Sequence, residues 1–183
     1  MFTQVRSRIT GKQVIGLFIL TNLVYGVMLS FSIPMLMSHS SGLPIFDMSP
    51  MGYSFAEAAE LLFALGGDGR EFYMTQLALD TLYPFLFGLC YFVLLQWVIK
   101  KGNVSGVQWQ WLSLFPIVAA LFDYLENICI YLMLSSFPEL STTLVSISSA
   151  FTITKSTLTT VYWLGLVILI TMIAIQKYRH RAA

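Results

Sequence analysis

Four long apolar runs constrain the fold of this chain more than any other feature of its sequence. They cover residues 14–37, 73–99, 109–134 and 147–176. A helix needs about 20 predominantly apolar residues to cross the hydrocarbon of a bilayer, and each run is long enough to do so. The runs are continuously apolar rather than alternating, which disfavours a β-barrel. The sequence therefore predicts an all-α, polytopic membrane protein built as a bundle of four transmembrane helices.

The composition leaves little room for a second, soluble domain. Of the 183 residues, 57% are hydrophobic and only 10% are charged. These proportions differ strongly from those of a soluble globular domain, so we expect residues 1–183 to form one membrane domain in contact with membrane lipids. The sequence holds no phosphate-binding loop, dinucleotide fingerprint or nucleophile elbow, and it predicts no binding of nucleotides or nucleic acids.

The basic residues predict the orientation of the chain in the membrane. Eight of the ten Lys and Arg residues precede the first run, separate the second from the third, or follow the fourth. They are Arg6, Arg8, Lys12, Lys100, Lys101, Lys177, Arg179 and Arg181. With four spans these segments share one face, and the positive-inside rule places that face and both termini in the cytoplasm. We expect a multi-pass protein of a plasma membrane, a bacterial inner membrane or an endomembrane.

The loop between the first two runs predicts a short amphipathic helix. Ser54 and Glu57 have the spacing of a capping box, and a glycine pair at 66–67 ends the pattern. Between them, apolar residues recur at helical spacing: Phe55, Ala58, Leu62 and Leu65. We expect this helix to lie in the outer membrane interface with its apolar side toward lipid. The alternative is a helix that covers an outward-facing cavity.

Ionisable side chains interrupt three of the apolar runs, and they are the candidates for function. In the stretch LFDYLENICIYL, Asp123, Glu126 and Asn127 are spaced i, i+3 and i+4, so they share one helix face. Asp80 occurs in the second run and Lys155 in the fourth. A charge near the bilayer centre costs about 2.5–3.5 kcal/mol, so these groups should face one another inside the bundle.

Depth and charge sharpen this expectation. A rise of about 1.5 Å per residue places Asp80, Glu126, Asn127 and Lys155 in the outer half of the membrane. Asp123 lies about one turn deeper. Three carboxylates and one lysine would leave a formal charge of minus two, which a low-dielectric interior does not hold without compensation. Protons on one or two carboxyls, a bound cation or cationic ligand, or Arg70 reaching in from the outer interface would supply it.

Residues near these charged groups on the same helices are predicted to complete the site. Pro84 frees a carbonyl about one turn earlier in its helix, and that carbonyl must find another partner. Lys155 continues into a stripe of hydroxyl side chains. We predict catalytic roles for Asp80, Asp123 and Glu126, and ligand-binding roles for Asn127, Lys155, Tyr83, Thr159, Tyr162 and Arg70.

The sequence predicts no metal site and no cofactor. His39 and His180 have no companions at ligand spacing, and Asp68 lies among glycines without further acids at ligand spacing. Cys90 and Cys129 fall in opposite halves of the membrane, so we expect both thiols to be free packing residues.

Three functions fit these residues. The first is an outward-opening polar cavity that binds a small amphiphilic or cationic ligand or a lipid, and that can carry acid/base chemistry of the isomerase kind. The second is proton- or cation-coupled transport, for which four helices per chain imply a homo-oligomer. The third is a non-catalytic assembly subunit whose buried charges pair with one another or with a membrane partner. The sequence supports an enzyme no more strongly than a protein without catalytic activity.

In architecture alone, the predicted bundle resembles the small four- or five-helix membrane proteins around the sterol isomerases and the sigma-2 receptor. Those proteins also hold intramembrane carboxylates in a cavity that lipids can reach. No motif of that group matches this sequence residue by residue, so the resemblance assigns no catalytic residue here.

Overall fold

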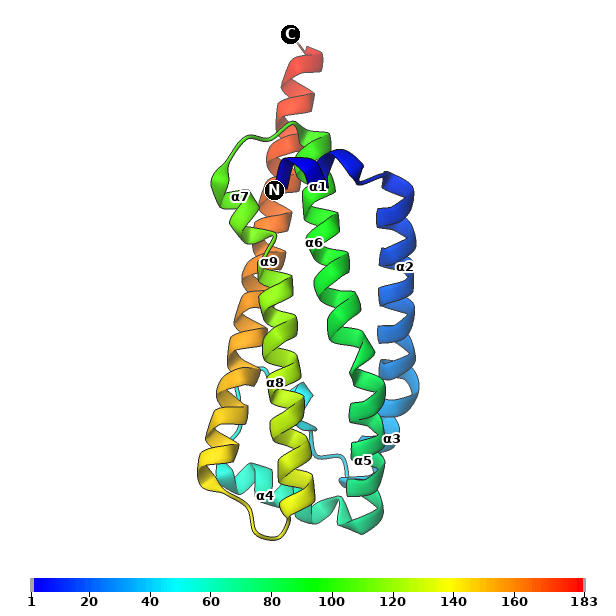
Figure 1. Ribbon diagram of the computed structural model, residues 1–183, viewed down its shortest axis with the longest axis vertical. Helices are drawn as coiled ribbons and strands as arrows, with labels where there is room; N and C mark the ends of the chain where they lie inside the picture. The colour runs from blue at the N-terminus through cyan, green and yellow to red at the C-terminus, as the bar shows by residue number, and fades with distance from the viewer. Residues whose placement is uncertain (1, 183) are drawn as a thin grey trace.

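Four long apolar helical segments dominate the computed structural model, which describes residues 2–182 (Figure 1). They cover Gly11–His39, Gly66–Gly102, Val107–Ser136 and Thr142–Arg179, and each is long and apolar enough to cross a membrane. No strand occurs among the described residues. The all-α class and the four predicted apolar segments are therefore confirmed, and every helix extends past its predicted run at both ends.

The first segment is one continuous helix with a widened turn. It consists of α2 (Gly11–Val27), the π-helical turn η1 (Met28–Ser32) and α3 (Ile33–His39), and a short α1 (Phe2–Arg8) precedes it. Pro34 lies in the first turn of α3 and has no N–H to donate to the preceding turn. A π-helical turn accommodates such an interruption without ending the helix.

The second segment is interrupted close to Pro84. It consists of α5 (Gly66–Asp80) and α6 (Leu82–Gly102), which meet at Thr81. Pro84 lies three residues after this junction, and the Tyr124 hydroxyl donates a hydrogen bond to the Thr81 carbonyl over 2.8 Å. The glycine pair at 66–67 both follows α4 and begins α5, so this helix starts earlier than expected.

The last two segments form an antiparallel pair. A short α7 (Val107–Leu112) leads into α8 (Phe115–Ser136), and α9 (Thr142–Ala182) follows after a brief turn. At about 1.5 Å per residue, the 41 residues of α9 extend to roughly 60 Å, longer than a bilayer core is thick. The end of α9 accordingly projects beyond the other helices (Figure 1).

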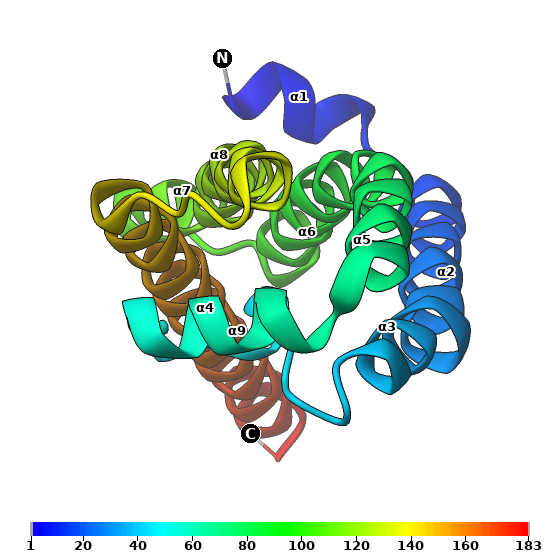
Figure 2. The same cartoon turned by 90° about the horizontal axis from the view of Figure 1, so that it is seen from below.

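The long helices pack in an open row. α2 packs on α6, α6 on α8, and α8 on α9, whereas α2 and α9 are not among the pairs that pack extensively. Both termini, α1 and α7 lie at one end of the molecule, here called the terminal end (Figure 1). The short α4 (Phe55–Ala64) crosses the opposite end, here called the α4 end (Figure 2).

The capping box of α4 is present as predicted, but its apolar stripe faces the protein. Ser54 Oγ accepts a hydrogen bond from the Glu57 amide over 3.2 Å, and the Glu57 carboxylate accepts one from the Ser54 amide over 2.7 Å. Ala58, Leu62 and Leu65 are almost fully buried. The expectation that this stripe points to lipid is wrong, because α4 lies against α5 and α9 and its stripe completes a protein core.

Two apolar cores hold the helices together. The core at the α4 end includes Leu36, Phe46, Leu62, Tyr73, Ile130 and Met133. The core nearer the terminal end includes Leu95, Ile99, Leu112, Tyr162, Leu166 and Leu169. Between these two cores, α8 and α9 carry the polar side chains of the candidate site, among them Asp123 and Lys155.

Candidate functional site

A cavity of about 350 Å³ lies between the two cores. Its walls come from the first helical segment, α5, α6, α8 and α9, and from the 3-10 turn η2 (Phe46–Met48). One part of the wall is apolar, with Met28, Leu77 and Phe87. The polar part contains Asp47, Gln76, Asp80, Asp123, Lys155 and Thr159. The cavity therefore offers an apolar chamber with a strongly acidic side.

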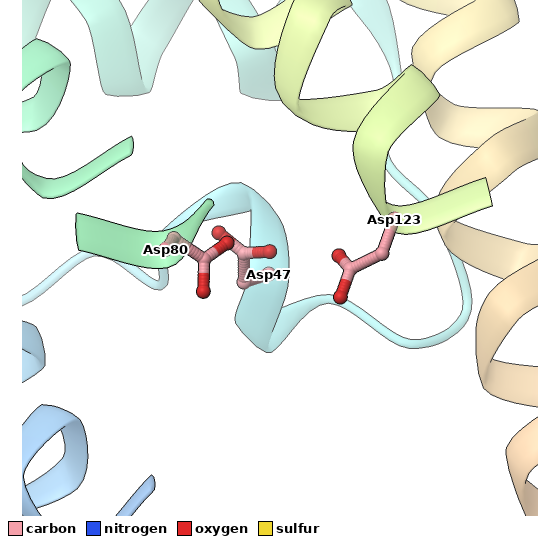
Figure 3. Close-up of side chains that lie close together, drawn as sticks. All are labelled: Asp47, Asp80 and Asp123. Carbon is pink, nitrogen blue, oxygen red and sulfur yellow. The ribbon is translucent and has the colours of Figure 1, made fainter. Parts of the chain in front are cut away.

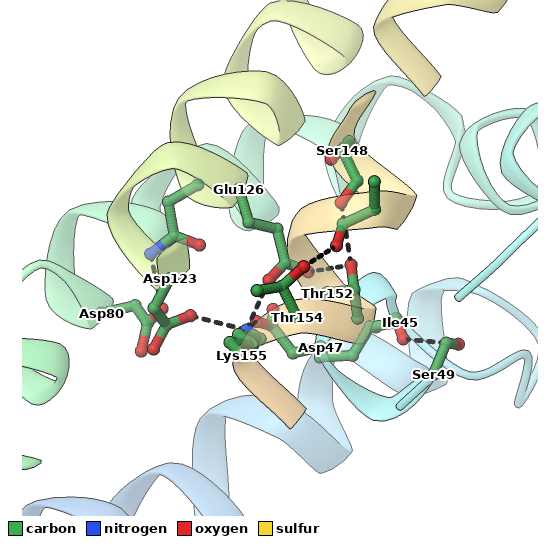
Figure 4. A network of polar contacts seen from close by, with 12 residues as sticks. Ile45, Asp47, Ser49, Asp80, Asp123, Glu126, Ser148, Thr152, Thr154 and Lys155 are labelled. Atoms are coloured by element: carbon green, nitrogen blue, oxygen red, sulfur yellow. Dashed lines mark hydrogen bonds and ion pairs between the residues drawn. The ribbon is translucent and has the colours of Figure 1, made fainter. Parts of the chain in front are cut away.

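Lys155 on α9 joins three carboxylates from two other elements (Figure 4). Its Nζ lies 2.5 Å from Asp123 Oδ1, 2.6 Å from Glu126 Oε2 and 2.9 Å from Asp47 Oδ1. The contacts to Asp47 and Asp123 are hydrogen bonds, and the contact to Glu126 Oε2 is an ion pair without hydrogen-bond geometry. Lys155 on α9 thus ties η2 to α8.

Glu126 is the most deeply buried member of this group. Its side chain is fully buried, and the Thr152 hydroxyl donates a hydrogen bond of 2.7 Å to Oε1. Thr152 is one turn after Ser148, which accepts a 2.7 Å hydrogen bond from the Tyr53 hydroxyl. Burial raises the pKa of Tyr53 above its ordinary value, which keeps this phenol neutral and able to donate. On successive turns of α9, Ser148 therefore holds the loop before α4 and Thr152 holds the buried glutamate.

Asp80 lies beside two of these carboxylates but does not pair with the lysine. Asp80 ends α5 at the break before α6, and its Oδ2 accepts a 2.8 Å hydrogen bond from Asn127 Nδ2. One oxygen each of Asp47, Asp80 and Asp123 lies within 4.8 Å of the others (Figure 3). Among the residues that the structure describes, Asp80 pairs with no cation. It is therefore the acid in the cavity wall whose charge has no local partner.

We call Asp47, Asp80, Asp123, Glu126 and Lys155 the carboxylate cluster. Four carboxyls and one lysine carry a formal charge of minus three when all are ionised, one more negative than the sequence analysis expected. Low-dielectric surroundings do not hold such an excess without compensation. Protons or a bound cation must supply the missing positive charge.

Two buried acceptors beside the cluster also lack donors. Gln76 lines the cavity one turn before Asp80 and is only 4% exposed, yet no described group donates to its Oε1. Asn127 Oδ1 is likewise buried without a partner. Buried polar atoms in native proteins are nearly always hydrogen-bonded, so an orphan acceptor in a cavity wall indicates a donor that the chain itself does not provide.

Most of the predicted site residues come together. Asp80, Tyr83, Asp123, Lys155 and Thr159 line the cavity. Glu126 and Asn127 stand directly behind it and contact Lys155 and Asp80, respectively. The i, i+3, i+4 pattern in α8 therefore brought three side chains to one face, as the spacing indicated.

Arg70 and Tyr162 lie elsewhere. Arg70 donates to the Leu62 carbonyl over 2.9 Å, and its guanidinium lies 4.6 Å from the centre of the Phe137 ring. It forms no ion pair within the described part of the chain, so it does not compensate the cluster. The Tyr162 hydroxyl donates to the Tyr91 carbonyl over 2.8 Å inside the core nearer the terminal end. Tyr162 is therefore part of that core and not of the cavity wall.

Sequence reasoning missed Asp47 and Gln76. Asp47 lies in the loop between the first two apolar runs, and the only local signal was a single acid among Ile45, Phe46 and Met48. Its ion pair with Lys155 spans 108 residues of sequence. Gln76 carries no charge, and a single amide in an apolar run gives no signal that separates a ligand-binding residue from a structural one.

The cluster could also be considered as a metal site, although the sequence predicted none. Asp47, Asp80 and Asp123 form a group of carboxylates that could hold a metal ion. Two of the three, however, already accept from the Lys155 ammonium, which a metal ion would have to displace. The arrangement therefore suits an ammonium-like ligand at Asp80 better than a hard metal ion. Cys90 and Cys129 are both buried and free, as predicted.

Comparison of the chain with protein-family models, with curated proteins and with solved structures found no match. A function for this chain must therefore be argued from the residues and the geometry of its cavity.

Proposed function

We propose that this protein is a multi-pass membrane protein whose carboxylate-lined cavity binds a small amphiphilic cation. One observation carries the proposal: three aspartate oxygens lie within 4.8 Å of one another in a cavity wall, and the single nearby lysine pairs with only two of these aspartates. A positively charged ligand at Asp80 would supply the missing charge, and its attraction is strong in a low-dielectric cavity.

The rest of the cavity supports an amphiphilic ligand. A volume of about 350 Å³ is within the range of small-molecule sites, which combine mostly apolar walls with a few convergent polar groups. The apolar side chains of Met28, Leu77 and Phe87 would receive the ligand's apolar part while its cation lies against the aspartates. Acid/base chemistry and proton-coupled transport would use the same carboxyls, and both depend on this binding step.

A thermal-shift experiment with matched ligands tests the proposal. Octylammonium should raise the unfolding temperature of the purified protein in a nonionic detergent, whereas octanol and octanoate, with the same chain, should not. Asp80→Asn should abolish the shift. Asp68→Asn is the matched control, because it removes an exposed acid from the same helix. The proposal fails if octylammonium shifts wild type no more than octanol does.

A second candidate function follows from the ion pairs of Lys155. Its three ion pairs fasten η2 onto α8 and α9, so the cluster could serve only to hold the loop in place. In that case Asp123→Asn should destabilise the protein, and no amine should alter the unfolding temperature of the wild type. A stable Asp80→Asn variant that has lost an amine response rules out the purely structural role.

We further propose that both termini are cytoplasmic and that α4 lies at the outer interface. The shared position of both termini at one end and the eight basic residues near that end support this orientation (Figure 1). Phe63 and Phe55 on α4 are 79% and 41% exposed, as expected of aromatic side chains that contact headgroups. Reporter fusions at the two termini and at the 137–141 turn test the orientation. A periplasmic or lumenal signal from either terminus would overturn it.

A further inference from the structure

We infer that the ligand reaches the cavity from the hydrocarbon layer, through a gap between α2 and α9, and that it is a single-chain amphiphile with a primary ammonium group. The inference rests on the proposed function and adds the route and the chemical class of the ligand. It follows from the helix packing, from the depth of the cavity mouth, and from the donors that the cavity wall lacks.

The gap follows from the order of the helices. α2 packs on α6 and α9 packs on α8, so the first and last helices of the row are left without extensive contact (Figure 2). The cavity wall includes Tyr25 from α2 and Thr160 from α9. Both residues are exposed, Tyr25 by 40%. The cavity therefore reaches the molecular surface between these two helices.

The mouth lies at the middle of the helices. Tyr25 is equally distant in sequence from Gly11 and His39, and Thr160 is at the midpoint of Thr142–Arg179. In a helix that crosses a membrane, the central residues lie within the hydrocarbon. The α4 end of the cavity is different, because η2 lies across it and the ion pair between Asp47 and Lys155 holds η2 in place. An apolar chain thus has a direct path from lipid, whereas a polar solute would have to pass η2.

The rings beside the mouth form a wall that an alkyl chain can follow. Tyr25 stacks on Tyr83 with ring centroids 5.2 Å apart, and Tyr83 and Phe87 pack at 5.9 Å. All three side chains line the cavity. Opposite them, α9 contributes Thr159 and Thr160. A single chain would lie between an aromatic wall and the threonines, with its head at the aspartates.

The orphan acceptors specify the head group. Gln76 Oε1 is buried without a donor, and Asp80 is one turn further along α5 with no cation. A primary ammonium carries three N–H donors and can satisfy both groups and a third acceptor from Asp47 or Asp123. A quaternary ammonium carries the charge but no donor, and it would leave Gln76 unsatisfied. The wall therefore favours a primary ammonium over a trimethylammonium group.

Binding of radiolabelled dodecylammonium to the protein in lipid nanodiscs tests the route. Thr160→Trp should weaken binding at least tenfold, because the indole fills the mouth. Val161→Trp, at the same depth on a neighbouring exposed position, should bind within twofold of wild type. The smaller Thr160→Leu should give an intermediate loss, which keeps the test valid if the tryptophan variant does not fold. Equal binding by all three variants overturns the lateral route while leaving the proposed function intact.

The head-group preference is tested in the same assay. Dodecyltrimethylammonium should compete at least tenfold more weakly than unlabelled dodecylammonium against wild type. Gln76→Leu should remove most of that preference, because the acceptor that requires a donor is gone. Equal competition by both amphiphiles against wild type overturns the primary-ammonium class. If wild type binds neither amphiphile saturably, the proposed function itself fails, and that result differs from each of the other outcomes.

Discussion

Two buried glutamines in this molecule differ in whether the chain supplies hydrogen-bond partners for their side-chain oxygens. Near the terminal end, Gln96 is fully buried, its Oε1 accepts from Arg6 Nε over 3.2 Å, and its Nε2 donates to Ser113 Oγ over 2.8 Å. Ser113 in turn donates to the Gln110 carbonyl over 2.7 Å. In the cavity, Gln76 is as deeply buried, but its Oε1 has no donor among the described residues.

The difference separates a structural polar site from a candidate binding site. Gln96 is satisfied on both sides by groups of the chain, so it joins α6 to the end of α7 and to α1 without needing any ligand. The carboxylate cluster has surplus negative charge and orphan acceptors next to a cavity. Unsatisfied buried groups destabilise a fold, so they persist where another function requires them.

The largest effect on this comparison should come from removing the lysine of the cluster. Lys155→Met leaves the fully buried Glu126 and two aspartates without their cation, and loss of one partner from a buried ion pair costs about 3–5 kcal/mol. Chemical unfolding in detergent should show this loss. Lys101→Met, an exposed lysine, should change the free energy of unfolding little. A stable Lys155→Met variant would mean that the cluster is already neutralised by protons.

The two buried glutamines should respond differently to the same substitution. Gln96→Leu removes the acceptor of Arg6 Nε and the donor to Ser113 Oγ, and an unsatisfied buried group costs about 1–3 kcal/mol. Gln76→Leu removes an acceptor that had no partner, so the free energy of unfolding should be unchanged or higher. Unfolding curves of the two variants, measured side by side, check this. If both variants lose the same free energy of unfolding, the two glutamines do not differ in the way proposed.

Within the cluster, two aspartates should also differ. Asp123→Asn removes an acceptor of Lys155 and should lower the stability by about 1–3 kcal/mol. Asp80→Asn removes a charge with no cation beside it, and an amide oxygen can still accept from Asn127. It should therefore leave the free energy of unfolding unchanged or raise it. The reverse order of stability would show that Asp80, not Asp123, is the main partner of the lysine.

The smallest effect should lie outside both sites, at α4, and it should depend on pH. Hydrogen bonds from the Ser54 amide and side chain lower the pKa of Glu57 below its ordinary value of 4.5. A carboxyl whose pKa is lowered by folding stabilises the fold at neutral pH, and this contribution is lost as pH falls below 4.5 toward the folded pKa. The unfolding temperatures of wild type and Glu57→Gln should therefore converge in that range. A constant difference at all pH values would contradict the role of the charge.

The sequence was sufficient for features that depend on near neighbours along the chain. The four apolar runs predicted the four long helices, because span length and hydropathy are local properties. The spacing of Asp123, Glu126 and Asn127 predicted their common face, since helical periodicity alone determines it. The capping box at Ser54 is confirmed for the same reason.

Only the tertiary structure decided what those faces meet. The loop acid Asp47 reaches Lys155 across 108 residues, the stripe of α4 turns inward, and Arg70 remains at Phe137 away from the cluster. No local pattern encodes these contacts, because they depend on how separate helices pack and on which buried groups find partners. The gap between α2 and α9 is of the same kind: each helix is predictable alone, and the opening exists because of the order in which they pack.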